Sequence, residues 1–81
     1  MLEKVEVVDL IEALENGTVQ VRTKTVFRED GVEIGSRFHR HVVVPGADYS
    51  GEDTRVQGIC AALHTAEAIA AYQAAQAVKG V

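Results

Sequence analysis

The sequence has no tryptophan, one cysteine, one proline, two phenylalanines and two tyrosines. Aromatic side chains supply much of the buried area of small cores, so we expect a thin core of aliphatic residues and alanine. The single cysteine, Cys60, excludes an internal disulfide, whereas small secreted domains usually contain several. We therefore expect a protein of a reducing compartment or of a non-secreted particle.

Long apolar runs are missing too, as is an N-terminal segment in which an apolar stretch follows a charged start. We therefore predict neither a membrane span nor a signal peptide. Basic residues are in the minority, because 8 Lys and Arg stand against 12 Asp and Glu, and the formal charge is −4. This acidic balance disfavours a dedicated DNA-binding domain, although a local basic patch can override the net charge.

The 81 residues otherwise have a globular composition, since 47% are hydrophobic and 25% are charged. A chain of this size buries about 60% of the surface of its unfolded state, which is near the lower limit for folding alone. We predict one domain over the whole chain, with a β-meander in residues 1–44, a loop in 45–53 and a helical segment in 54–79. A thin core in so small a chain favours self-association or docking into a larger assembly.

Two turn signals divide the first half of the chain. Asn16-Gly17 and Asp30-Gly31 each lie between runs rich in β-branched residues, and both dipeptides favour two-residue hairpin turns. The antiparallel strands are expected over residues 3–15, 18–29 and 32–44. Residues 9–15 could instead form a capped helical turn that ends at the glycine.

The alanine-rich second half predicts a turn and two helices. Pro45-Gly46 fits the central positions of a type II turn. A side-chain cap within residues 50–53, with acids in the first turn, should start a helix. The apolar stripe of this helix would consist of Val56, Ile59, Cys60 and Leu63. Thr65 should cap a second helix with Glu67 in its first turn and Lys79-Gly80 at its end. The predicted fold class is therefore α+β, a three-stranded antiparallel meander packed against one or two C-terminal helices.

The turns also predict the register of the strands. If Glu15 lies opposite Thr18 and Glu29 lies opposite Val32, the alternation of side chains creates one mostly apolar face, which the helices should cover. The predicted apolar face consists of Val8, Leu10, Glu12, Leu14, Val19, Val21, Thr23, Thr25, Phe27, Ile34, Ser36, Phe38, Arg40 and Val42.

The same register collects cations on the opposite face. The candidate partner-binding residues are Arg22, Lys24, Arg28, Arg37, His39 and His41. Like charges opposite one another destabilise a sheet, so this cluster needs an explanation. It could be a solvated face neutralised by acids such as Asp9, or a docking surface for an acidic partner, more often a protein. Single-stranded nucleic acid is the least favoured partner, because the predicted face has no aromatic side chains besides histidines.

Arg40 falls on the predicted apolar face, where an unpaired charge is costly. We expect a structural ion pair between Glu12 and Arg40 at the edge of the core, and a pair between subunits is the alternative. His39 and His41 share one strand face and could chelate zinc or nickel, but no third ligand converges on them. Cys60 lies in an apolar helix stripe, where a thiol is inert. We therefore predict no catalytic residue, no metal and no cofactor.

Several segments together resemble a group of small proteins encoded by tailed bacteriophages. The matching pattern spans roughly residues 19–75: a turn at Asp30-Gly31, the element Phe38-His39-Arg40, Pro45-Gly46, and the segments Val56-Gln57-Gly58-Ile59-Cys60, Leu63-His64-Thr65 and Ala71-Tyr72-Gln73-Ala74. The resemblance implies a component of the virion or its tail region and transfers no catalytic residue.

The sequence therefore predicts a non-enzymatic bacteriophage structural protein, associated with the tail or capsid and present in several copies. It would be made in the host cytoplasm, and its partners would be other virion proteins and copies of itself. The alternative is a small regulatory module that binds a host protein or single-stranded nucleic acid.

Overall fold

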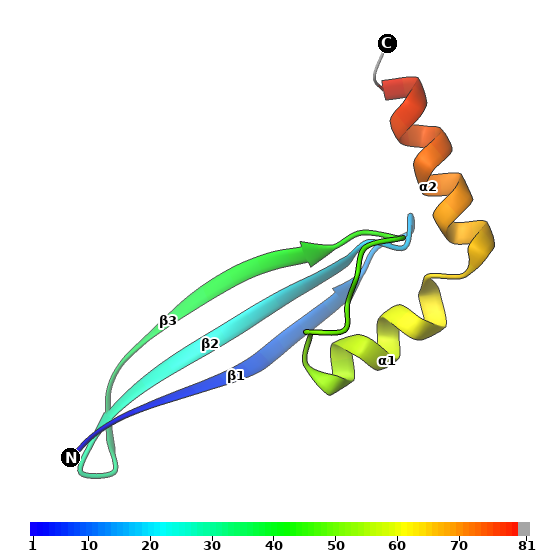
Figure 1. Cartoon of the computed structure of the whole chain (residues 1–81). Helices are drawn as coiled ribbons and strands as arrows, with labels where there is room; N and C mark the ends of the chain where they lie inside the picture. Colours follow the sequence, from blue (N-terminus) through cyan, green and yellow to red (C-terminus); the bar gives the residue numbers. More distant parts are fainter. Residues whose placement is uncertain (80–81) are drawn as a thin grey trace.

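The computed structural model describes residues 1–79 and has the α+β architecture that the sequence predicts (Figure 1). Its elements are β1 (Leu2–Ala13), β2 (Val19–Glu29), β3 (Val32–Val43), α1 (Thr54–Leu63) and α2 (Ala66–Lys79). The strands form an antiparallel meander in the order β1-β2-β3, so residues 9–13 are strand and not helix. The expected glycine cap at Gly80 lies outside the described residues.

The first turn is one residue longer than predicted. The Leu14 amide donates to the Thr18 carbonyl at 2.8 Å, and the Gly17 amide donates to the Leu14 carbonyl at 2.9 Å. Only Gly17, with φ +90°, adopts the left-handed region in this turn, so the loop has three residues and ends in a glycine bulge. Glu15 therefore does not pair with Thr18. Residues 10–13 of β1 are shifted by one residue relative to the predicted pairing with β2.

The second turn forms as predicted. Asp30 and Gly31 have φ values of +51° and +82°, and Glu29 lies opposite Val32. Farther along, Arg28 pairs with Glu33 while Phe27 pairs with Gly35, so Ile34 is an extra residue in a β-bulge. Because a shift of one residue exchanges the two faces of a strand, the bulge reverses most of β3 relative to the prediction.

These shifts correct the predicted apolar face. Val19 and Val21 of β2 lie on the face that the helices cover, as expected. Their neighbours on the flanking strands are Ala13, Ile11, Val43 and His41. Six residues that were predicted on this face lie on the opposite one: Leu10, Glu12, Ser36, Phe38, Arg40 and Val42. A second bulge, at Asp9, returns the side chains of residues 2–8 in β1 to the faces on which they were predicted. Val8 therefore packs beside the core.

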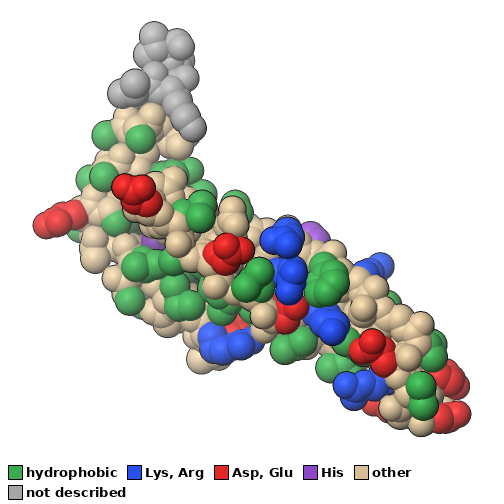
Figure 2. All heavy atoms as spheres, turned by 180° about the vertical axis from the view of Figure 1, so that it is seen from behind, with side chains coloured by type: hydrophobic (Ala, Val, Ile, Leu, Met, Phe, Trp, Pro, Cys, Tyr) green, Lys and Arg blue, Asp and Glu red, His purple; other side chains and the backbone are tan. Residues whose placement is uncertain are grey.

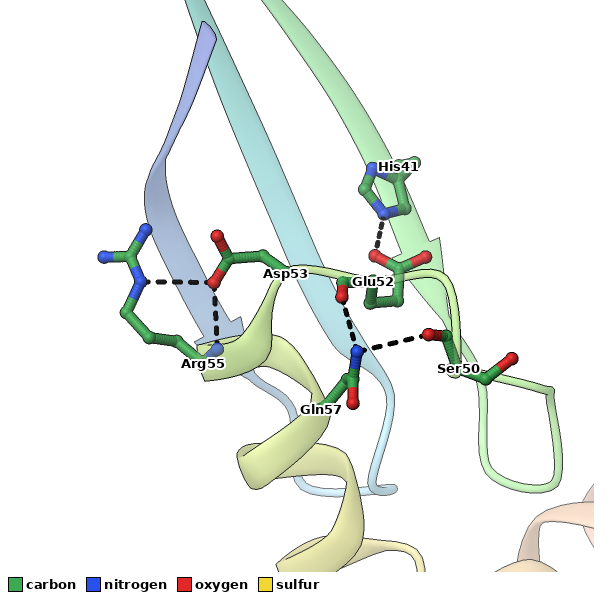
Figure 3. Close-up of polar contacts among 6 residues, drawn as sticks. All are labelled: His41, Ser50, Glu52, Asp53, Arg55 and Gln57. Atoms are coloured by element: carbon green, nitrogen blue, oxygen red, sulfur yellow. Dashed lines mark hydrogen bonds and ion pairs between the residues drawn. The ribbon is translucent and has the colours of Figure 1, made fainter.

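The link between sheet and helices follows local sequence signals. Gly46 has φ +92°, and the Ala47 amide donates to the Val44 carbonyl at 3.0 Å, which gives the predicted type II turn. The Asp53 carboxylate caps α1 by accepting from the Arg55 amide at 2.9 Å (Figure 3). The acids therefore precede the first turn of α1 and do not lie within it. The Thr65 hydroxyl caps α2 through the Ala68 amide, as predicted.

The buried core is small. Val19, Val21 and Val43 of the sheet pack against Val56 and Cys60 of α1. Ile59 is partly buried beside them, whereas Leu63 is exposed. The core lies under the end of the sheet nearest the helices, and the rest of the sheet extends beyond them (Figure 1).

The molecule is consequently elongated, with principal extents of 53 × 26 × 18 Å. Its radius of gyration is 16.4 Å, against about 12 Å for a compact chain of this length. It exposes 5619 Å², roughly 900 Å² more than the value expected for its mass. Figure 1 shows α2 pointing away from the sheet. Within the described residues, no helix combines the length and the hydropathy that crossing a bilayer requires.

A core this small should be sensitive to the loss of single methyl groups. We expect Val56→Ala to lower the free energy of unfolding by about 2 kcal/mol, because it removes fully buried apolar atoms and leaves a cavity. The matched control is Val32→Ala on the exposed tip, which should change it by no more than about 0.5 kcal/mol. Urea unfolding followed by circular dichroism measures both, and equal effects would contradict the assignment of the core.

Candidate functional site

The face of the sheet that points away from the helices is the candidate site, and we call it the open face. The strand pairing assigns to it Val5, Val7, Leu10, Glu12, Gln20, Arg22, Lys24, Val26, Arg28, Ser36, Phe38, Arg40 and Val42. Figure 2 shows Lys and Arg side chains beside hydrophobic ones over the middle of the elongated body. The open face is therefore both cationic and apolar.

Arg22 lies at the centre of this face. Its Nε and Nη2 atoms donate to the two carboxylate oxygens of Asp9 at 3.0 and 2.8 Å. The bulge places Asp9 as an extra residue between Val8 and Leu10, where its side chain can reach Arg22 across the strand pair. This two-point ion pair lowers the pKa of Asp9 and raises that of Arg22, in both cases chiefly through the side-chain hydrogen bond.

Phe38 is part of the same cluster. The guanidinium carbon of Arg22 lies 4.5 Å from the centroid of the Phe38 ring, a cation–π contact. Phe38 is opposite Lys24 in the sheet, and Arg40 is opposite Arg22. Phe38 nevertheless remains 53% exposed, so about half of its surface is accessible to a partner.

A shallow groove of about 370 Å³ runs beside this cluster. The groove is lined by Leu10, Glu12, Gln20, Val21, Arg22, Arg40, His41 and Val42. Glu12 and Arg40 therefore share a face, as predicted, but it is the open face and not the face over the core. The ion pairs formed by the described residues do not include Glu12 with Arg40.

The predicted cationic cluster is divided between the two faces. Arg22 and Lys24 lie on the open face, whereas Arg37, His39 and His41 lie on the face toward the helices. The bulge at Ile34 causes this division, because it shifts β3 by one residue relative to β2. Arg28 lies on the open face near the tip, opposite Glu33, as follows from the predicted pairing of Glu29 with Val32. The role of these residues in binding a partner stays a prediction.

His41 of β3 connects the sheet to the loop before α1. Its Nε2 lies 2.7 Å from the Glu52 carboxylate (Figure 3). The His39 ring stacks on His41 with the two centroids 6.2 Å apart. The Gln57 side-chain amide donates to the carbonyls of Ser50 and Glu52. These contacts fix the loop against β3, so His41 acts in the internal structure of the fold.

Cys60 and His64 both belong to the internal packing of the fold. The thiol of Cys60 is fully buried, and burial raises its pKa, which keeps it in the unreactive thiol form. His64 donates from Nε2 to the Gly17 carbonyl at 2.7 Å and so ties the end of α1 to the first turn. Within residues 1–79, no three His, Cys, Asp or Glu side chains are placed to hold a metal ion.

Sequence reasoning expected Asp9 to neutralise this face but did not pair it with Arg22, and it missed the stacking of Arg22 on Phe38. It also missed the hydrogen bond from Arg55 of α1 to the Val8 carbonyl at the β1 edge. Each depends on a bulge or on a contact between distant segments. The one available signal was an acid, Asp9, within a run of apolar strand residues.

Comparisons of the chain with protein families, with curated proteins and with solved structures found no match. The site is therefore interpreted from its own geometry.

The ion pair at the centre of the open face should make stability depend on pH. The folded state lowers the pKa of Asp9, so this contribution is complete above the unfolded pKa of about 3.9 and is lost as the pH falls through the lower folded value. We expect Asp9→Asn to destabilise the protein more at pH 6 than at pH 3, as measured by urea unfolding. In an Arg22→Gln background, the same substitution should have a much smaller pH-dependent effect. An unchanged effect in that background would contradict the assigned pair.

Proposed function

We propose that this protein is a non-enzymatic structural subunit that docks against other protein chains in a multicopy assembly. The observation that carries the proposal is the exposed surface of 5619 Å², which exceeds the value expected for a monomer of this mass by roughly 900 Å². A standard interface buries about 800 Å² on each partner, so the excess is close to one such interface.

The type of surface that is exposed supports the same function. Large apolar side chains are exposed along the sheet, at both of its ends and on α1. Among the residues whose exposure the structure describes, the most exposed large hydrophobic side chains are Met1, Leu2, Val5, Val7, Leu14, Val32, Ile34, Phe38, Val42 and Leu63. Four of them, Val5, Val7, Phe38 and Val42, share the open face with Lys and Arg side chains, and apolar groups gathered beside polar ones are typical of protein–protein contact sites.

The proposed setting is a bacteriophage virion, with the protein in the tail or capsid. This part of the proposal rests on the sequence pattern that resembles small proteins of tailed bacteriophages, from the turn at Asp30-Gly31 through Pro45-Gly46 to the helical end. Its partners would be other virion proteins and copies of itself.

Quantitative mass spectrometry of purified particles tests this proposal. Particles produced from the genome that encodes the chain should contain it in several copies, at a fixed ratio to a known tail or capsid protein. The control is the infected-cell lysate from which the particles are purified. Abundant protein in the lysate together with its absence from intact particles would contradict the virion role.

One observation favours a second candidate function, a small regulatory module that binds single-stranded nucleic acid. The sequence placed no aromatic ring on the cationic face, but the structure places Phe38 there beside Arg22, Lys24 and Arg40. An exposed ring among cations can stack on a base while the cations contact phosphates. The ion pair with Asp9 and the net charge of −4 both weaken this attraction.

Fluorescence anisotropy with a labelled oligonucleotide distinguishes the two functions. Nucleic-acid binding should weaken steeply between 50 and 200 mM salt, roughly tenfold or more if several phosphates are contacted. It should also be reduced by Phe38→Ala, whereas Val32→Ala at the tip should have no effect. If the protein acts only by protein docking, as we propose first, no binding should be seen at low salt.

A further inference from the structure

The two outer edges of the sheet differ in how they are protected. The edge of β1 is interrupted by the bulge at Asp9, and the Arg55 guanidinium donates to its Val8 carbonyl. The edge of β3 also has a bulge, at Ile34, but its pairing with β2 is regular from Gly35 to Val43, and among the described residues its backbone hydrogen bonds all belong to the ladder with β2. Neither helix runs alongside β3 in Figure 1. Unprotected strand edges readily pair with another strand.

The exposed side chains of β3 form a pattern that is symmetric about one residue. Phe38 is 53% exposed, and the apolar residues four positions before and after it, Ile34 and Val42, are 61% and 56% exposed. In an antiparallel pair of identical strands centred on Phe38, Ile34 of each strand would lie opposite Val42 of the other. The strand is therefore complementary to itself.

From this self-complementarity we propose that β3 pairs with β3 of a second copy, antiparallel and centred on Phe38, to form one continuous six-stranded sheet. The pairing extends over the regular residues 35–41, with the bulge residue Ile34 of each copy next to Val42 of the other, and joins the open faces of the two copies on the same side. The inference rests on the proposed multicopy function and assigns the surface through which copies of this chain meet.

Neighbouring registers fit less well. A pairing centred on Arg37 would place Arg37 directly opposite its own copy, and one centred on Arg40 would do the same for Arg40. Like charges in direct opposition are destabilising. A pairing centred on His39 would place Phe38 opposite Arg40 and would separate Ile34 from Val42. The register centred on Phe38 avoids opposed arginines and pairs apolar residues with each other.

Light scattering on purified protein tests the edge pairing through two matched variants. Phe38→Glu places two carboxylates opposite each other at the proposed centre, while Lys24 next to it can still pair with the new acid within one copy. Val7→Glu adds the same charge opposite the same lysine, but at the β1 edge of the same face. We expect the wild type and Val7→Glu to have twice the chain mass of 8.7 kDa. Phe38→Glu should raise the dissociation constant of the dimer roughly tenfold or more.

A cysteine at the centre tests the register directly. Opposed residues in a sheet have Cβ atoms about 4.5–5.5 Å apart, close enough for a disulfide after a small adjustment. Phe38→Cys should form a covalent dimer under mild oxidation, whereas Arg40→Cys, opposite Ser36 in this register, should not. The buried thiol of Cys60 is common to both variants and serves as an internal control.

Three results would each overturn the edge pairing. The wild type could be monomeric, Phe38→Glu could dimerise as tightly as Val7→Glu, or Phe38→Cys and Arg40→Cys could cross-link equally. These results are separate from those for the virion role. Particles that contain the protein while the purified chain is monomeric would overturn the edge pairing alone. A dimer with the predicted cross-link that is absent from particles would overturn the virion role alone.

Discussion

The contact between three valines of the sheet and one side of α1 determines the rest of the structure. Val19, Val21 and Val43 meet Val56 and Cys60 at one end of the meander, and these residues form the buried core. Strands of up to 12 residues extend well past that contact, because a helix of 10 residues covers only part of their length. The uncovered sheet is consequently left to solvent or to another chain, and the proposed function starts from this imbalance.

The charges of the open face are arranged around the same uncovered surface. Asp9 projects from a bulge and holds Arg22, and Arg22 in turn lies over the ring of Phe38. Arg22 lies opposite Arg40 in the sheet. The ion pair with Asp9 offsets the charge of Arg22 and so limits the repulsion between the two arginines. A guanidinium held by two hydrogen bonds above a half-exposed ring is already oriented, and groups that are oriented beforehand lose less entropy when they bind.

The sequence predicts local features of this fold better than its faces. The turn at Asp30-Gly31, the turn at Pro45-Gly46 and the cap at Thr65 form as expected, because each depends on residues next to one another in the chain. The order and type of the elements follow from the same signals.

The candidate site is harder to predict because one residue more or less in a strand exchanges its two faces. Asn16-Gly17 fits a two-residue turn and also the end of a three-residue loop, and only tertiary packing decides between them. The bulge at Ile34 is followed by Gly35, and a glycine inside a strand often marks a bulge, but the predicted register did not include one. The bulge moves Arg37 to the helix side and Phe38 to the open face. The predicted membership of the cationic face was therefore wrong for the residues of β3 and correct for the residues of β2.

The central claim is that this chain completes its burial of apolar surface by association. Association links stability to concentration, because the bound state is favoured by mass action. The most direct measurement is the midpoint of thermal unfolding over a hundredfold range of protein concentration. The account predicts a midpoint that rises steadily with concentration, and a midpoint that stays constant would contradict it.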